Sequence, residues 1–207
     1  MNPQTLTITI DHKNALTQAA GIIRNGGVIA FPTDTVYGIG ASAFQNDSIA
    51  KIYQTKIRSQ LKAIPILLGD LEDLSRITPT VSPIVERIIE KFWPGALTLV
   101  LHMLPTLPSN LSTTPTIGVR IPDHTITRQL LRVTGPLAAT SANLSGKPGA
   151  LNAAEVLDQL NGKIDLILDG GTSTGGIAST VLDCTGDVPV ILRDGPVTWE
   201  MIRSEIY

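Results

Sequence analysis

Five basic residues occupy positions from which they could bind an anionic ligand. Lys56, Arg58 and Lys62 lie within seven positions of one another, and Arg120 and Arg193 each end an apolar run that is typical of a buried strand. Cations placed at strand ends by a rigid sheet can converge on one pocket, where several together favour a polyphosphate or carboxylate ligand. The alternative for each residue by itself is a solvated surface charge. The pattern predicts an anion site.

Polar and small residues follow two further apolar runs. The stretch PTDTVYGIG at 32–40 comes after the run at 28–31, and TSAN at 140–143 comes after the run at 136–139. Loops at the carboxyl ends of strands in open α/β sheets usually bind ligands, so both stretches are interpreted as site loops. The glycines that continue to Gly149 allow the backbone to approach a ligand closely. Asp34 is expected to close an Asx-turn, with magnesium binding as the alternative.

Two common nucleotide motifs are excluded. The stretch GIGASA at 38–43 matches a dinucleotide fingerprint, but a basic helix end stands about 20 residues on, where an acid is required. The stretch SGKP at 145–148 is not a P-loop, because proline replaces the magnesium-binding Ser or Thr. No recognisable triad or metal motif includes a histidine, so the three are interpreted as structural: His12, His102 and His124.

Composition describes the class of protein. A chain of 207 residues with 43% hydrophobic residues can bury a large core, and we expect one domain over 1–207. No apolar run reaches the roughly 18 residues of a membrane span, which predicts a soluble, cytoplasmic protein. The single Cys184, interpreted as a core residue, excludes an internal disulfide and a multi-cysteine zinc site. The formal charge of −2 argues against a broad basic face for nucleic acid, so any direct tRNA contact would be local and weak.

The order of elements predicts an α/β fold with an open, twisted, mixed sheet flanked by helices. Apolar runs and turn signals predict strands near 5–10, 28–31, 64–68, 97–102, 116–121, 137–140, 165–168, 179–183 and 189–193. Helices are expected at 16–25, from 47, and near 82–91, 124–133, 153–160 and 198–205, with Asp47 as a cap and Gly26 ending the first helix. The last strands are expected to be antiparallel. Residues 105–116 and 169–179 are interpreted as long loops.

Several motifs in order resemble one family over residues 14–203. The stretches PTDTVYGIG, IYQTKIR, WPGALTLVL, IGVRIPDH, PLAATSANLSGKPG, STVLD and ILRDG are similar to those of the YrdC-like threonylcarbamoyl-AMP synthases, in the same order and spacing. The resemblance implies a sheet with a large concave basic cavity. It also implies a nucleotidyltransferase that makes L-threonylcarbamoyladenylate from L-threonine, bicarbonate and ATP, releasing pyrophosphate. The product would pass to a tRNA threonylcarbamoyl transferase complex for threonylcarbamoyladenosine modification of tRNA.

The resemblance also implies roles for individual residues. Lys56 and Arg58 would be catalytic. The residues implied to bind threonine are Thr35, Arg120, Ala139 and Ser179. The residues implied to bind ATP are Arg58, Lys62, Thr116, Ser141, Asn143, Gly149 and Arg193. Mg²⁺ is expected to arrive with ATP, because the sequence has no dedicated carboxylate site for a metal.

One segment departs from the family pattern. Residues 59–64 read SQLKAI where relatives read like R-P-x-x-K-P-L, so both prolines are missing from the loop after Arg58. This departure keeps a divergent paralogue as one alternative. A non-catalytic RNA-binding module is another, although 4% aromatic residues offer few stacking surfaces for RNA bases. A hydrogenase-maturation relative is excluded, because that activity belongs to much longer chains.

Overall fold

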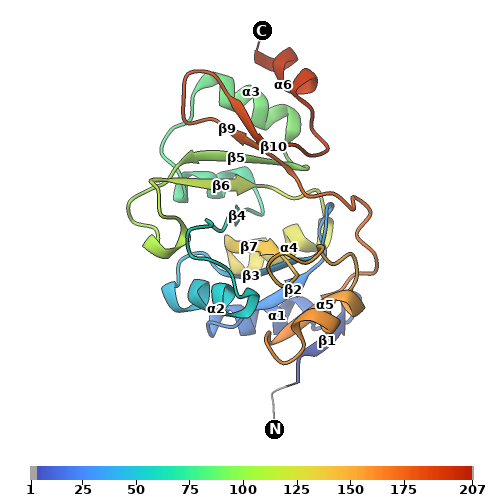
Figure 1. The fold of residues 1–207 in the computed structure, drawn as a ribbon. Coiled ribbons are helices and arrows are strands. Elements are labelled where there is room, and N and C mark those ends of the chain that lie inside the picture. Colours follow the sequence, from blue (N-terminus) through green and yellow to red (C-terminus); the bar gives the residue numbers. More distant parts are fainter. Residues whose placement is uncertain (1–3, 207) are drawn as a thin grey trace.

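Ten strands form one twisted sheet that runs from one end of the molecule to the other (Figure 1). The structure is a computed structural model, and it describes residues 4–206. The strands are β1 (Leu6–Thr9), β2 (Ile29–Phe31), β3 (Gly38–Ser42), β4 (Ile66–Leu67), β5 (Leu97–His102), β6 (Thr116–Arg120), β7 (Leu137–Ser141), β8 (Leu166–Asp169), β9 (Thr180–Asp183) and β10 (Val190–Arg193).

Strand order mixes parallel and antiparallel neighbours. The order across the sheet is β1-β8-β2-β3-β7-β4-β6-β5-β9-β10. The pairs β1–β8, β2–β8, β4–β6 and β5–β9 are parallel, and the other five are antiparallel. The prediction of an open, mixed α/β sheet is confirmed, and so is the antiparallel pairing of the last two strands.

Helices pack on both faces of the sheet (Figure 1). The helices are α1 (Ala15–Arg24), α2 (Asn46–Lys56), α3 (Pro83–Phe92), α4 (Thr125–Thr134), α5 (Ala153–Leu160) and α6 (Trp199–Ile206), with 3₁₀ turns η1 (Leu71–Arg76) and η2 (Ser109–Leu111). Buried residues of α2, α3, α5 and α6 join the larger apolar core, whereas those of α1 and α4 form a second core with β2, β7 and β8. None of the helices described in 4–206 is long and apolar enough to cross a membrane.

One part of the sheet is covered by helices on a single face only. Side chains alternate between the two faces of a strand. In β5, Leu97, Leu99 and Leu101 face the larger core, so Thr98 and Val100 face the other side. The described members of the second core include no residue of β5, β6 or β9. The α1–α4 layer therefore stops short of these strands and leaves room for a cavity.

The strand β3 is the main correction to the expected elements. Residues 38–40 were expected to belong to the site loop at 32–40, but residues 38–42 form a strand between β2 and β7. Glycine is a weak strand former, so the two glycines obscure the strand pattern in the sequence of this segment. A Cβ on Gly38 or Gly40 would lie 3.2 or 3.0 Å from the Phe31 ring. The two glycines thus admit the aromatic ring over the strand, and that packing replaces the missing side chains.

Of the two residues predicted to mark helix ends, one is confirmed and the other is wrong. Gly26 follows α1 with φ 79°, a left-handed conformation that glycine adopts at low cost, as predicted. Asp47 was expected to cap the second helix, but Gln45 is the residue before α2 and Asp47 lies in its first turn. A carboxylate in the first turn still stabilises the helix through the helix dipole. The sequence therefore indicated the start of the helix, but it placed the cap two residues too late.

Candidate functional site

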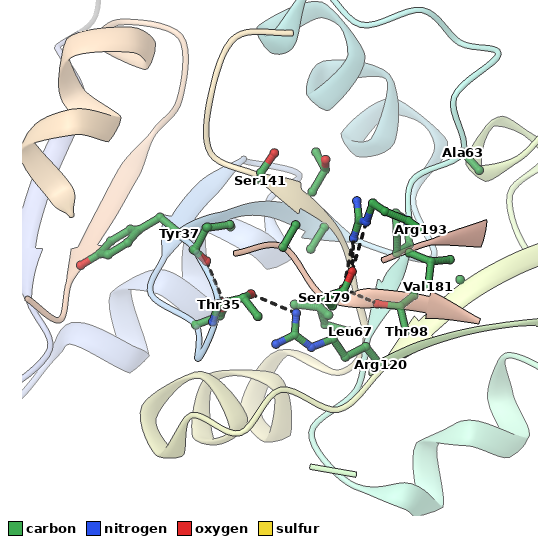
Figure 2. A pocket seen from close by; sticks show the side chains of 18 of the residues that line it. Thr35, Tyr37, Ala63, Leu67, Thr98, Arg120, Ser141, Ser179, Val181 and Arg193 are labelled. Carbon is green, nitrogen blue, oxygen red and sulfur yellow. Dashed lines mark hydrogen bonds between the residues drawn. The ribbon is translucent and has the colours of Figure 1, made fainter. Parts of the chain in front are cut away.

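A cavity of about 290 Å³ opens on the face of the sheet that α1 and α4 leave uncovered (Figure 2). Its lining includes Leu67, Thr98, Val100, Gly118, Ala139 and Val181. These residues come from five adjacent strands, and those that share a strand are two positions apart, so they lie on one face. A Cβ on Gly118 would lie 3.0 Å from Thr98 Cγ2, so glycine at this position keeps the cavity open.

Arg120 is buried at the end of β6 and makes three contacts with its guanidinium group. Its Nε donates to Gly95 O at 2.8 Å, its Nη1 to Thr35 Oγ1 at 3.1 Å, and its Nη2 to Asp34 Oδ1 at 2.5 Å. The arginine and aspartate side chains are 7% and 16% exposed, so this is a largely desolvated ion pair. Arg120 therefore has a fixed orientation beside the Thr35 hydroxyl (Figure 2).

The Asx-turn expected at Asp34 is not present in the described structure. Thr33 takes that role, because its Oγ1 accepts the Thr35 backbone N–H at 3.1 Å and bonds the Thr35 hydroxyl at 2.9 Å. The Asp34 carboxylate instead pairs with Arg120. A turn of this kind needs only a short side-chain acceptor, and threonine supplies one as aspartate would.

Arg193 approaches the same cavity from the end of β10. Its Nε and Nη2 donate to Ser179 O at 3.1 and 2.7 Å, and its Nη2 lies 3.3 Å from Ser179 Oγ. The Ser179 hydroxyl bonds Thr98 Oγ1 at 2.8 Å (Figure 2). The chain thus places a cation and two hydroxyls side by side.

Two arginines line the cavity, and among the described residues Arg120 is the one paired with a carboxylate, that of Asp34. Arg120 and Arg193 both line it, and no aspartate or glutamate is among its lining residues in the described chain. Burial lowers the pKa of Arg193, and the nearby Arg120 lowers it further. The Arg193 guanidinium stays protonated, because an arginine pKa begins far above neutrality. The site is suited to an anion.

Lys56 lies beneath the wall formed by Ser141, at the last residue of α2. It is 1% exposed, and its Nζ donates to the Ser141 carbonyl, to Asn143 O at 2.5 Å and to Asn143 Oδ1 at 3.4 Å. Ser141 lines the cavity, whereas Lys56 and Asn143 do not. Burial lowers the pKa of Lys56 to about 7, with a further contribution from Arg58.

Arg58 and Lys62 lie on the loop that follows α2. Ile57 has φ 52°, a left-handed conformation that is costly for a β-branched residue, and it turns the chain so that Ile57 is exposed while Lys56 is buried. The Arg58 guanidinium donates to Lys62 O at 3.2 Å and to Ala63 O at 2.9 Å. Ala63 lines the cavity, but the Lys62 side chain is exposed. Hydrogen bonds from Arg58 thus hold a loop that lacks the family's prolines.

The remaining predicted residues lie at or next to the cavity. Ala139 lines it. Thr116 is the first residue of β6, and it lies on the same face of the strand as Gly118 and Arg120, which follow it by two and four positions. Its Oγ1 forms a hydrogen bond with Thr114 Oγ1 at 2.9 Å. Gly149 lies against Val36, a lining residue, because a Cβ there would be 3.5 Å from Val36 Cγ1. Of the twelve predicted residues, six line the cavity: Thr35, Arg120, Ala139, Ser141, Ser179 and Arg193.

Sequence reasoning missed two features of the site. Tyr37 lines the cavity, and its buried hydroxyl donates to Gly171 O at 2.8 Å and accepts from Gly170 N at 3.0 Å. These bonds fix the start of the glycine-rich loop at 170–178, whose Gly176 N–H donates to Thr35 O at 2.9 Å. The second feature is the apolar floor of the cavity. The two-residue spacing from Arg120 indicates Gly118, but no local pattern indicates residues of the other strands.

The fold and the cavity together define an α/β protein with an arginine-lined cavity on one face of its sheet. The sequence model of the family described as "Telomere recombination" (Sua5_yciO_yrdC) matches residues 21–195. The chain belongs to this Sua5/YciO/YrdC family.

Relatives with assigned names agree with this membership. The chain is 42% identical over 194 residues to a threonylcarbamoyl-AMP synthase of Bacillus subtilis, covering 92% of this chain and 56% of that protein. It is 37% identical to a putative threonylcarbamoyl-AMP synthase of Mycobacterium tuberculosis over 91% of this chain and 88% of that protein. The solved structure of Pyrococcus abyssi Sua5 complexed with L-threonine superposes with a TM-score of 0.92 at 36% identity, covering 98% of this chain and 60% of that chain. The chain thus spans little more than half the length of the first and third of these proteins.

Proposed function

We propose that the protein is an L-threonylcarbamoyladenylate synthase, a nucleotidyltransferase that uses L-threonine, bicarbonate and ATP. The observation that carries this proposal is the pair of arginines that line one cavity, the buried Arg120 and the more exposed Arg193, each beside hydroxyl groups. Two separate cations suit two anionic substrates that must be brought together. The names of the relatives support the choice of substrates.

L-Threonine is proposed to bind beside Arg120. The guanidinium would hold the substrate carboxylate, and Thr35 and Ser179 would offer hydroxyls to its polar groups, next to the backbone of Ala139. The structure of the Pyrococcus abyssi relative with bound L-threonine supports this class of ligand.

ATP is proposed to bind toward Arg193 and Ser141. Both line the cavity, and Arg58 holds the adjoining loop. Further contacts are proposed for Lys62, Thr116 and Gly149, whereas the predicted ATP residue Asn143 lies outside the cavity lining. The described residues contain no group of three or more His, Cys, Asp or Glu side chains arranged to hold a metal. Magnesium would therefore be held by phosphate oxygens of ATP and would arrive with it.

The proposed reaction needs alignment more than a protein nucleophile. The threonine amine combines with bicarbonate to give a carbamate and water. A carbamate oxygen then attacks the α-phosphorus of ATP, a new P–O bond forms, and pyrophosphate leaves with the electrons of the broken bond. Arg58 and Arg193 would neutralise charge as pyrophosphate departs. The product is a reactive mixed anhydride, which we propose is passed to a tRNA threonylcarbamoyl transferase complex.

Pyrophosphate release tests the proposal. With ATP, Mg²⁺ and bicarbonate present, the purified protein should release pyrophosphate only after L-threonine is added. Arg58→Ala should lower this rate about 10²-fold, because one transition-state contact is lost. Arg203→Ala is the matched control, since Arg203 is exposed on α6, and it should leave the rate unchanged. Release that is independent of threonine would contradict the proposal.

A further inference from the structure

The ammonium group of Lys56 uses all its hydrogen-bonding capacity within the protein. A lysine ammonium has three donors and no acceptor. Here three acceptors surround it, namely the Ser141 carbonyl and the backbone and side-chain oxygens of Asn143. No N–H remains for a phosphate oxygen while these bonds persist. The buried position at the end of α2 is consistent with this arrangement, because the C-terminal end of a helix favours a cation.

The same residue also holds the chain after β7 through its backbone. Lys56 O accepts the Ser145 N–H at 3.0 Å. Asn143 uses its Nδ2 group locally, donating to Leu144 O at 2.8 Å and to Lys147 O at 2.7 Å. Side chain and backbone therefore join the end of α2 to residues 141–147, which we call the 141–147 turn.

This turn carries a wall of the cavity. Ser141 lines it, and the next residue anchors the turn to the residue before β3, because Ala142 N donates to Tyr37 O at 2.7 Å. Arg58, two positions after Lys56, donates a hydrogen bond to the carbonyl of Ala63, which lies on the following loop and lines the cavity. The two basic residues thus fix two different walls from one helix end.

We infer that Lys56 is a positioning residue, which acts with Asn143 to hold the 141–147 turn and so fixes Ser141 in the cavity wall. This assignment replaces the catalytic role expected from the family signature. Its kinetic consequences rest on the proposed function, whereas its structural consequences do not. No carboxylate pairs with Lys56 in the described chain, and burial lowers the pKa of its ammonium group to about 7.

Hydrogen exchange in the ligand-free protein tests the structural part. Lys56→Met should speed exchange of the amides at 144–147 about 10- to 100-fold, because bonds from a charged donor are lost. Lys51→Met is the matched control. Lys51 lies on the same helix and donates to a backbone carbonyl, Gly26 O at 2.7 Å, but it is exposed and its bond is to the end of α1 rather than to the turn. If exchange at 144–147 were equal in the two variants, the inference would be overturned.

A double-mutant cycle tests the kinetic part. Lys56→Met and Asn143→Ala should each raise the KM for ATP about tenfold or more with a smaller change in kcat, and the double variant should resemble either single one, because both break one unit. Additive losses in kcat with unchanged KM would instead show that Lys56 contacts the reacting phosphate. If Lys56→Met does not fold, exchange at 144–147 in Asn143→Ala decides the question. A protein that makes no adenylate would contradict the proposed function and leave the exchange test intact.

Discussion

Replacing Arg120 by lysine should lower kcat/KM for L-threonine about 10²-fold. The guanidinium reaches three separate acceptors, Gly95 O, Thr35 Oγ1 and Asp34 Oδ1, and a single ammonium cannot span them. Lysine keeps the positive charge, so the Asp34 carboxylate is not left unpaired in a buried place. The loss would therefore report the fork geometry that orients a carboxylate. Threonine-dependent pyrophosphate release at varied threonine concentration measures it.

Arg132→Lys is the matched control for this experiment. Arg132 also forms a two-nitrogen contact with a carboxylate, donating to Asp70 at 2.6 and 2.7 Å, but on the surface of α4 and outside the cavity lining. An exposed pair of this kind contributes little to stability, because solvent screens the two charges. The control should keep full activity. Equal activity in the two variants would mean that threonine does not bind at Arg120.

Gly195→Ala should both destabilise the protein and inactivate it. A Cβ there would lie 2.7 Å from Ala178 O and from the Ser179 backbone carbon, closer than real Cβ atoms approach. These are backbone atoms, so the start of β9 must shift, at a cost of about 1 to 3 kcal/mol of unfolding free energy. Ser179 would move with it and no longer hold Arg193. Chemical denaturation and pyrophosphate release measure the two effects.

Gly186→Ala separates this steric effect from a general effect of glycine replacement. Gly186 lies in the connection between β9 and β10, and a Cβ there meets no heavy atom within 4 Å. Its stability and activity should match those of the unchanged protein. A Gly195→Ala variant as stable and active as Gly186→Ala would show that the close approach at residue 195 does not fix the position of Ser179.

Local patterns in the sequence were enough for most of the elements. Strands and helices with apolar periodicity were predicted close to their observed bounds, and Gly26 was predicted as a left-handed cap. The strand β3 was missed because its packing comes from Phe31 of the neighbouring strand and not from its own side chains. Strand propensity depends on a residue's own side chain, so it cannot predict packing by an aromatic ring from another strand.

The site was predicted in part for a similar reason. Cations at strand ends do meet in one cavity, as Arg120 and Arg193 show. The partner of Arg120 could not be predicted, because Asp34 lies 86 positions away and the pairing depends on the strand order. Lys56 could not be placed either, since its acceptors are mostly main-chain carbonyls, which every residue type supplies.

Isotope labelling of the product tests the central claim most directly. The protein is incubated with ATP, Mg²⁺, L-threonine and ¹³C-bicarbonate, and the nucleotide product is identified by mass spectrometry. We predict threonylcarbamoyl-adenylate that carries the heavy carbon in its carbamoyl group, formed together with pyrophosphate. An unlabelled threonyl-adenylate, or ADP with phosphate and no adenylate, would contradict the claim that this cavity joins threonine, bicarbonate and ATP.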